Sequence, residues 1–391
     1  MSGSLGGGKD SKEPSIIIGI DFGTTYSGVA WTDSEDCQNI RVISTWSTHL
    51  RNCSNTEKVP TALSYNENGQ VEAWGYDALR QAQEVRWFKL LLLEEKDVPS
   101  YVRRSAHFRE AREYQYEQNQ EPIDMVAAFL RRLWEHSLSL IIRELGNDSV
   151  ERSKFHIVIT VPAIWQPYAQ ERMRQAAQKA GLLTKRECGD TQLSLLSEPE
   201  AAALAVVSRL SKKSTVEASD RQIEPVGDTL VVCDAGGGTA DLISYVVQSV
   251  TPFEVQECVK GAGDLCGGTF VDEEFLNLMQ ERLGQKVFGQ FSKRETRKFL
   301  NDNWEHNIKP QFDCKQRSWL VEDLPAACRA PGRGQKRTKE IELSSDAVTQ
   351  VFEPVVEKNE ILLREQLAAI KAKYEEAAKA SSPILQFRSA L

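Results

Sequence analysis

The sequence predicts an α/β protein of two lobes. A chain of 391 residues is too long for one compact core. A strand, an aspartate, a turn of small residues and a second strand occur together near the start of the chain and again past its middle. Segments with apolar residues at helical spacing follow the first copy and end the chain. The repeat indicates an internal duplication, with one copy opening each lobe.

The second copy occupies residues 229–247 and is the richer in glycine. The turn and the acids at its ends are Asp234, Gly236, Gly237, Gly238, Thr239 and Asp241. Because glycine has no Cβ, the amides of such a turn can approach a ligand closely and form a concavity that binds anions. The two carboxylates are suited to hold Mg²⁺ through water. A plain glycine turn capped by two aspartates is the alternative interpretation.

The first copy, in residues 16–31, has the same plan. Its turn and the acid before it are Asp21, Gly23, Thr24, Thr25 and Tyr26. Two such turns that face each other would clamp a polyphosphate from both sides.

The pair of turns resembles the two phosphate loops of the actin-like ATPase superfamily, which includes actin, sugar kinases and the seventy-kilodalton heat-shock chaperones. Residues 21–27 (DFGTTYS) and 197–205 (SEPEAAALA) are most similar to the chaperone branch. Residues 87–91 (WFKLL) and 352–356 (FEPVV) resemble the divergent heat shock 70 kDa protein 12 group and its fungal relatives. The resemblance covers about residues 15–375. It implies a ribonuclease H-like fold in which each lobe is a mixed β-sheet with flanking helices.

The resemblance and the composition together predict the domain organisation. Residues 1–14 are rich in glycine, serine and charge and predict a disordered tail. Lobe I spans 15–225, with an outer subdomain at about 46–120, and lobe II spans 226–391, with an outer subdomain at about 263–340. The family continues with a strand and a glycine-rich turn that closes over adenine. No glycine follows Gly334 here, so we expect lobe II to lack this final adenosine-binding segment, although residues 384–387 can supply a short strand.

Periodicity predicts the elements of lobe I. A basic and aromatic segment, 76–93, predicts a helix, and residues 123–145 predict a long amphipathic helix. Residues 155–161 predict a buried strand. Residues 170–180 predict a helix that ends at Gly181, which is suited to a C-cap.

The same reasoning continues into lobe II. Residues 193–196 predict a short strand, and 201–210 a helix of small residues. Residues 253–259 predict a further strand. Thr269 and Asp272 have the spacing of a capping box at the start of the next helix. Ser345 is predicted to cap a helix that restarts at Pro354 and ends near Ala380.

The resemblance implies which residues bind nucleotide. Amides and hydroxyls of both turns would contact the phosphates: Gly23, Thr24, Thr25, Tyr26, Gly236, Gly237, Gly238 and Thr239. Asp21, Asp234 and Asp241 would anchor hydrated Mg²⁺. The candidate catalytic residues are Lys89, Glu198, Asp234 and Asp241, with Lys89 as the cation over the γ-phosphate. A solvated lysine and a helix N-cap acid are the alternatives for Lys89 and Glu198.

Two further pairs are candidate nucleotide ligands by the same resemblance. Gly267 and Gly268 lie in a stretch that is near the nucleotide in the family, and that also resembles a dinucleotide-binding loop. Glu305 and Lys309 would flank ribose and adenine. A plain salt bridge between residues four apart on one helix is their alternative.

Composition limits the partners. The net charge of −8 argues against a nucleic acid or an anionic membrane surface. The longest apolar runs, such as residues 201–207, are far shorter than a membrane span, and no signal peptide is evident. The eight cysteines include no C-x-x-C pair, which argues against a zinc ribbon. We therefore expect a cytoplasmic protein.

The predicted function is that of an ATP-binding, heat-shock-70-like nucleotide-binding domain. It would use ATP or ADP with Mg²⁺ and act as a weak Mg²⁺-dependent ATPase with a chaperone-like role, with client or co-chaperone proteins as possible partners. A non-catalytic nucleotide-sensing or interaction scaffold is the alternative, and a sugar-kinase-like phosphotransferase is the third. The sequence leaves open whether ATP is hydrolysed.

Overall fold

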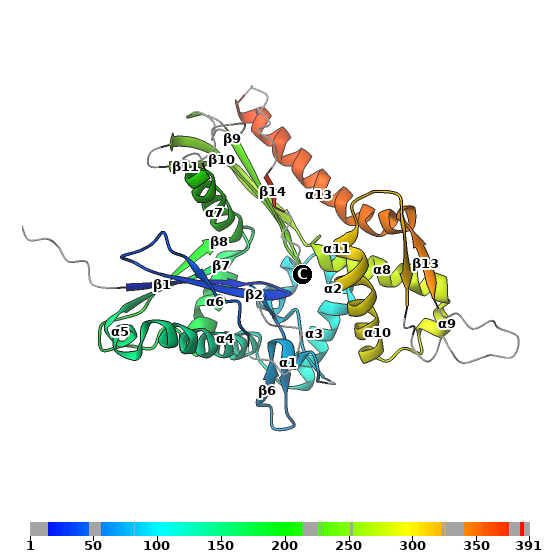
Figure 1. The fold of residues 1–391 in the computed structure, drawn as a ribbon, viewed down its shortest axis with the longest axis horizontal. Helices are drawn as coiled ribbons and strands as arrows, with labels where there is room; N and C mark the ends of the chain where they lie inside the picture. The colour runs from blue at the N-terminus through cyan, green and yellow to red at the C-terminus, as the bar shows by residue number, and fades with distance from the viewer. Residues whose placement is uncertain are drawn as a thin grey trace, which may run out of the picture. The chain divides into compact units, whose positions relative to one another are not determined.

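The computed structural model divides the chain into two compact units (Figure 1). Unit 1 comprises Met1–Val161 and Trp165–Leu196, and unit 2 comprises Pro162–Ile164 and Ser197–Leu391. The residues described are 15–46, 56–81, 83–213, 226–227, 229–250, 253–322, 324, 340–374 and 384–386. The predicted disordered tail, residues 1–14, lies outside them.

Unit 1 is built on a mixed sheet with the strand order β3-β2-β1-β7-β8, and β4 also pairs with β2. These strands are β1 (Ser15–Phe22), β2 (Tyr26–Asp33), β3 (Arg41–Val42), β4 (Val59–Pro60), β7 (Lys154–Val161) and β8 (Gln192–Ser197). β1 and β2 form an antiparallel hairpin in which Asp21 lies opposite Gly28, whereas β1 and β7 are parallel. Alternate residues of β1 and β7 are buried, as expected for strands that carry one face into a core.

The remaining elements of unit 1 cover this sheet or extend from it. They are β5 (Leu63–Tyr65), β6 (Val71–Trp74), α1 (Gly75–Ala78), η1 (Phe88–Leu92), η2 (Glu95–Asp97), α2 (Ser100–Arg104), α3 (Ala106–Glu117), α4 (Pro122–Leu145), α5 (Asn147–Arg152) and α6 (Pro167–Lys179). α4 begins with a proline, which is favoured in the first turn of a helix, and packs against α6 through its buried apolar face. The helices predicted over 123–145 and 170–180 and the strand over 155–161 are confirmed.

The helix predicted over 76–93 is wrong. The segment holds the short helix α1, the 3₁₀ helix η1 and irregular backbone between them. Trp87 lies in the left-handed region, with φ of 64°, which no α-helix can continue. Its buried indole stacks on His107 with ring centroids 5.1 Å apart. Tertiary packing of one aromatic ring therefore overrides the local helical pattern.

Unit 2 has a second mixed sheet, in the order β11-β10-β9-β14. Its strands are β9 (Thr229–Ala235), β10 (Ala240–Val250), β11 (Phe253–Asp264) and β14 (Ile384–Gln386). The first three are antiparallel neighbours, and β14 is parallel to β9, with Ile384 opposite Val232 and Gln386 opposite Asp234. The strand that the sequence allowed at 384–387 is therefore present.

Helix α7 (Glu198–Lys213) packs against β9 and β10 of this sheet. Ala203 of α7 shares a buried cluster with Ile243 and Tyr245 of β10. The compact units accordingly divide after Leu196, upstream of the boundary at 225 that the sequence predicts. Most of the polar segment between α7 and β9 lies outside the described residues.

The other elements of unit 2 follow β11. They are α8 (Gly268–Leu283), α9 (Gln285–Phe288), α10 (Lys293–Leu300), the π-helix η3 (Asn301–Ile308), α11 (Lys309–Gln311), β12 (Ser318–Val321), β13 (Ile341–Ser344) and α13 (Ser345–Tyr374). The long helix α13 packs against α8, β10 and β11 (Figure 1). It runs without a break through Pro354, so the predicted restart there is wrong.

The predicted caps of two helices are also wrong. The Ser344 hydroxyl, not that of Ser345, accepts the Ala347 N–H at the start of α13. The Ser345 hydroxyl instead donates to the backbone carbonyl of Arg317, just before β12, which ties the start of α13 to that strand. At the start of α8, the Thr269 hydroxyl donates to the Gly237 carbonyl rather than accepting a helix amide.

Candidate functional site

The first glycine turn joins β1 to β2 and is held in shape by its neighbours. A Cβ on Gly23 would lie 2.2 Å from the Tyr26 carbonyl oxygen, so this position requires glycine. Thr24 and Thr25 are buried. The Thr25 carbonyl accepts a hydrogen bond from the Thr61 N–H at 2.8 Å, just beyond β4. The turn is therefore braced from outside by the segment that carries β4.

The second glycine turn joins β9 to β10. Gly236 donates its N–H to the Thr239 carbonyl at 2.8 Å, and Asp234 lies directly opposite Asp241 in the hairpin. Directly opposite residues of an antiparallel pair share one face of the sheet, and like charges placed so destabilise it. The Asp241 side chain is only 1% exposed. Two carboxylates that share one face are oxygen ligands of the kind that Mg²⁺ prefers.

Two residues beside the second turn, Gly263 and Cys233, are affected by its acids. A Cβ on Gly263 of β11 would lie 2.9 Å from Asp241 Oδ1, so this glycine leaves room for the carboxylate. Burial, with the negative charges of Asp234 and Asp241, raises the pKa of the Cys233 thiol to about 11. Cys233 is therefore a neutral core thiol at physiological pH rather than a nucleophile.

Gly267 and Gly268 brace the second turn through their backbone. The Gly268 N–H donates to the Gly236 carbonyl at 3.0 Å, and the Gly267 N–H donates to the Gly238 carbonyl at 3.3 Å. A Cβ on Gly267 would lie 2.5 Å from the Gly236 oxygen, so the two backbones approach as closely as glycine allows. The amides of Gly267 and Gly268, two predicted nucleotide ligands, thus donate to the turn itself.

Asp21 is paired with a lysine that sequence reasoning missed. Lys58 Nζ lies 2.8 Å from Asp21 Oδ2, and the Thr160 hydroxyl donates to Asp21 Oδ1 at 3.3 Å. Burial by itself would raise the pKa of Asp21, but the positive charges of Lys58 and Lys89 outweigh it, so the pKa of that carboxyl lies below its ordinary value. Asp21 is therefore an ionised carboxylate whose charge is already balanced by Lys58.

Lys89 is not the solvated lysine of the alternative interpretation. It lies in η1, is 2% exposed, and has its Nζ 5.7 Å from the centre of the Phe22 ring and 5.4 Å from that of Trp165. Phe22 ends β1 just before the first turn. Lys89 is thus a buried cation next to that turn.

Glu198 occupies the first turn of α7, directly after β8. The Ser197 hydroxyl accepts the Glu200 N–H at 3.3 Å and also donates to the Glu200 carboxylate. Ser197 and Glu200 therefore cap this helix, a serine followed three residues later by a glutamate. Glu198 lies between these two capping residues.

Glu305 and Lys309 form their salt bridge within a larger buried network. Lys309 Nζ lies 3.1 Å from Glu305 Oε1 and 2.7 Å from Asp272 Oδ1. The Trp304 indole N–H donates to the same Asp272 oxygen at 2.8 Å, and Lys309 donates to the Gly268 carbonyl at 3.3 Å. Burial and the adjacent Glu305 carboxylate raise the pKa of Asp272, because one lysine cannot balance two buried acids fully.

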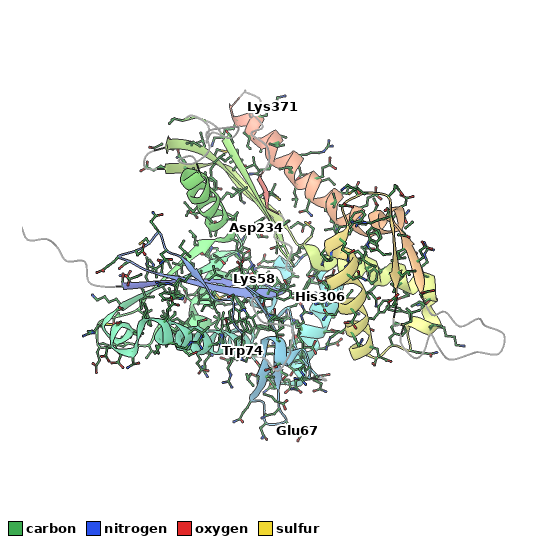
Figure 2. All side chains as sticks on the ribbon, viewed as in Figure 1. Lys58, Glu67, Trp74, Asp234, His306 and Lys371 are labelled. Carbon is green, nitrogen blue, oxygen red and sulfur yellow. The ribbon has the colours of Figure 1, made fainter. Side chains whose placement is uncertain are left out.

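Asp272 was missed as a site residue because its spacing from Thr269 indicated a helix cap. The network connects η3 to α8, whose first residue braces the second turn. Figure 2 labels Lys58 in unit 1 and Asp234 at the end of β9 in unit 2.

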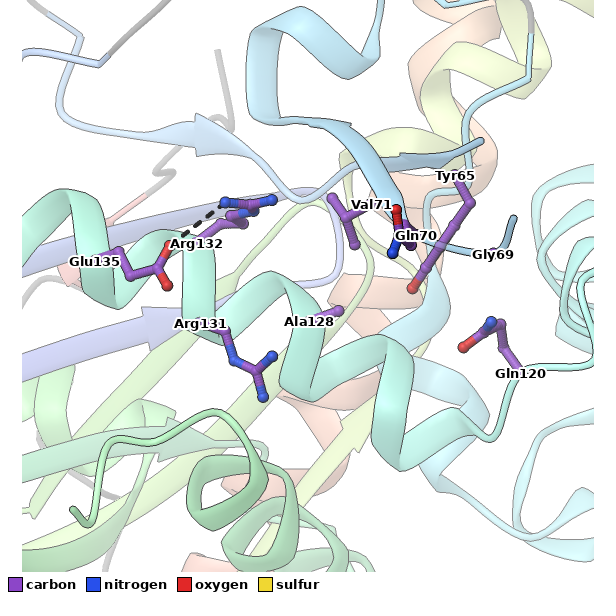
Figure 3. Close-up of a pocket in the computed structure, with 9 residues that line it drawn as sticks. All are labelled: Tyr65, Gly69, Gln70, Val71, Gln120, Ala128, Arg131, Arg132 and Glu135. Carbon is purple, nitrogen blue, oxygen red and sulfur yellow. Dashed lines mark ion pairs between the residues drawn. The ribbon is translucent and has the colours of Figure 1, made fainter. Parts of the chain in front are cut away.

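A pocket in unit 1 lies among other residues (Figure 3). Its lining consists of Tyr65, Gly69, Gln70, Val71, Gln120, Ala128, Arg131, Arg132 and Glu135. None of the predicted site residues lines it. In the described part of the chain, no group of three or more His, Cys, Asp or Glu side chains gathers as a metal cluster, and no helix is long and apolar enough to cross a membrane.

Comparison with known proteins identifies relatives of this chain. Heat shock 70 kDa protein 12A of Mus musculus is 28% identical over 328 residues, which cover 71% of this chain and 47% of that protein. Heat shock 70 kDa protein 12B of Homo sapiens is 26% identical and covers 72% of this chain and 47% of its own length. The predicted resemblance to the divergent heat-shock 70 branch is confirmed.

A further relative extends the similarity to bacterial chaperones. A chaperone protein HscA homolog of Acinetobacter baumannii (strain SDF) is 27% identical over 283 residues, which cover 70% of this chain and 39% of that protein. No protein-family model matches the chain. The fold class is accordingly the predicted actin-like ATPase fold, with a mixed sheet and flanking helices in each unit. The chain spans about half the length of the curated heat shock 70 kDa relatives it matches.

Proposed function

We propose that this chain is a heat-shock-70-like nucleotide-binding domain that binds ATP or ADP with Mg²⁺ and hydrolyses ATP weakly. The observation that carries the proposal is the presence of two glycine turns, each braced by backbone hydrogen bonds from a neighbouring segment. A fixed turn presents its amides without further ordering, which is what phosphate binding requires. The similarity to heat shock 70 kDa proteins supports the same assignment.

In this proposal the residues have separate tasks. The amides and hydroxyls of the two turns, apart from the Gly236 N–H that bonds within its own turn, bind phosphate oxygens. Asp234 and Asp241 hold the water shell of Mg²⁺, which when bound neutralises phosphate charge. Lys89 adds a buried positive charge beside the first turn, and Glu198 orients the attacking water. Positioning and charge neutralisation of this kind account for most of the catalysis of phosphoryl transfer.

A non-catalytic interaction scaffold is the second candidate, and one observation favours it. The charges of Asp21 and Lys309 are already engaged with partners inside the protein, Lys58 and Asp272. Charged groups that are already paired with each other contribute less to the binding of a ligand. The chaperone-like role, and client or co-chaperone partners, stay proposals drawn from the names of the relatives. Those names are of heat-shock and chaperone proteins, so they add nothing to the sugar-kinase alternative.

The substitution Asp234→Asn distinguishes two roles of this residue, a Mg²⁺ ligand and a cap of the turn. The substitution keeps the shape but removes one of two facing charges. If Asp234 holds Mg²⁺, the gain in ADP affinity that Mg²⁺ provides should fall at least about tenfold, and ATP turnover should fall with it. The thermal midpoint should stay unchanged or rise, because a like-charge repulsion is removed.

The measurements are phosphate release and titration of ADP with and without Mg²⁺. Asp302→Asn, at an exposed acid of η3, is the matched control and should leave both unchanged. A fall in the thermal midpoint with unaltered Mg²⁺ dependence would mean that Asp234 is a structural cap.

A further inference from the structure

The Lys58–Asp21 ion pair is built by the backbone around it. β4 pairs with the start of β2, with Val59 opposite Ser27, so Lys58 enters the sheet at a fixed register. The Tyr76 hydroxyl donates to the Lys58 carbonyl at 3.0 Å. The lysine is therefore anchored at its main chain as well as at its charged end.

The lysine side chain passes beside a glycine of β2. Gly28 lies opposite Asp21 in the β1–β2 hairpin, and opposite residues share one face of the sheet. A Cβ on Gly28 would lie 3.2 Å from the Glu57 carbonyl oxygen and at ordinary contact distance, 3.5 Å, from Lys58 Cγ. The lysine stem thus passes beside Gly28, and its Nζ reaches the Asp21 carboxylate.

The ion pair remains open to a ligand. The exposed fraction is 28% for the Lys58 side chain and 40% for that of Asp21. An ammonium group has three N–H donors, and the Asp21 contact uses one of them. A lysine that both neutralises the acid before a phosphate turn and keeps donors accessible is suited to bind a phosphate oxygen.

We propose that Lys58 is a phosphate-binding residue and the resident counter-cation of the first glycine turn, with Asp21 as the group that positions it. The inference rests on the proposed nucleotide binding and departs from the prediction that Asp21 is a Mg²⁺ ligand. Because a lysine supplies the positive charge at this turn, nucleotide binding retains a component that needs no metal. The second turn, where Asp234 faces Asp241, provides the Mg²⁺-dependent component.

The test is titration of the full chain with ADP, once in excess Mg²⁺ and once in EDTA. The wild type should bind ADP in EDTA. Lys58→Met should weaken binding in EDTA by about tenfold, the size of one charge-assisted hydrogen bond, and binding in Mg²⁺ by less. Lys58→Arg should restore most of the binding in EDTA. Lys96→Met, which removes an exposed lysine of another ion pair in unit 1, should change neither titration.

A double variant separates phosphate binding from a purely structural ion pair. Lys58→Met with Asp21→Asn leaves no unpaired carboxylate, so folding is preserved even if the single variant unfolds. Under the proposal the double variant still binds ADP weakly in EDTA, whereas recovery to the wild-type affinity would show that Lys58 acts only by pairing with Asp21. If removal of Mg²⁺ weakens ADP binding by the same factor in the wild type and in Lys58→Met, the role assigned to Lys58 is wrong, while the proposed function stands. Absence of ADP binding by the wild type under both conditions would overturn the proposed function and this inference together.

Discussion

Lys309→Met is expected to destabilise unit 2 by about 3–5 kcal/mol, the cost of breaking a buried ion pair from one side. The substitution keeps the stem but leaves the buried Asp272 and the partly buried Glu305 without their cation. It also removes the hydrogen bond to the Gly268 carbonyl at the start of α8. Hydrogen exchange of peptides from 268–283 and 301–311 measures the effect, since both segments meet at this network.

The loss should depend on pH in a defined direction. The pKa of Asp272 is already raised in the folded protein, and without Lys309 it rises further. A carboxyl whose pKa is higher in the folded than in the unfolded state contributes stability that is lost as pH rises through the folded value. Lys309→Met should therefore be more destabilising at pH 8 than at pH 5.

Lys298→Met is the matched control for this experiment. It removes an exposed lysine that pairs with Asp302 four residues later. Such surface pairs contribute at most about 1 kcal/mol. If both variants lose the same small amount of protection, the buried network does not stabilise unit 2.

Gly23→Ala is expected to abolish measurable nucleotide binding, or to weaken it at least about tenfold. The added Cβ would lie 2.2 Å from the Tyr26 carbonyl oxygen, well inside the 3.4 Å at which ordinary contacts begin. The turn must therefore move, and its amides no longer present the same concavity. Relief of such a clash costs about 1–3 kcal/mol of stability.

The control for Gly23→Ala lies in β1, the strand that leads into this turn. A Cβ on Gly19 would meet only the Ala30 carbonyl oxygen, at 3.8 Å, an ordinary contact. Gly19→Ala should keep both stability and ADP affinity near the wild type in a thermal melt and a titration. ADP affinity that is equal in the two alanine variants would show that the first turn does not contact the ligand.

The turns were predictable from sequence because their chemistry is local. Gly23 and Gly236 follow strands within a few residues of their aspartates, and the strand pattern is periodic. The same holds for α4, whose apolar spacing fixes its buried face over a long run. These features need no knowledge of distant contacts.

The contacts that modify the turns were not predictable in this way. Lys58 and Asp21 are 37 residues apart, and the segment around Lys58 is polar, without a periodic pattern. Asp272 and Lys309 are likewise 37 residues apart and lie on different helices, α8 and α11. Trp87 interrupts a helical pattern through a ring stack. Each depends on tertiary packing, which single-sequence patterns do not contain.

The central claim is that the chain binds nucleotide, and calorimetric titration of the full chain with ADP in excess Mg²⁺ tests it most directly. We expect saturable binding at about −6 to −8 kcal/mol, a dissociation constant on the order of micromolar to tens of micromolar. The affinity should drop in Gly23→Ala and not in Gly19→Ala. The absence of any binding heat at millimolar ADP, in a preparation whose thermal melt shows a folded protein, would contradict the proposed function and favour the interaction scaffold.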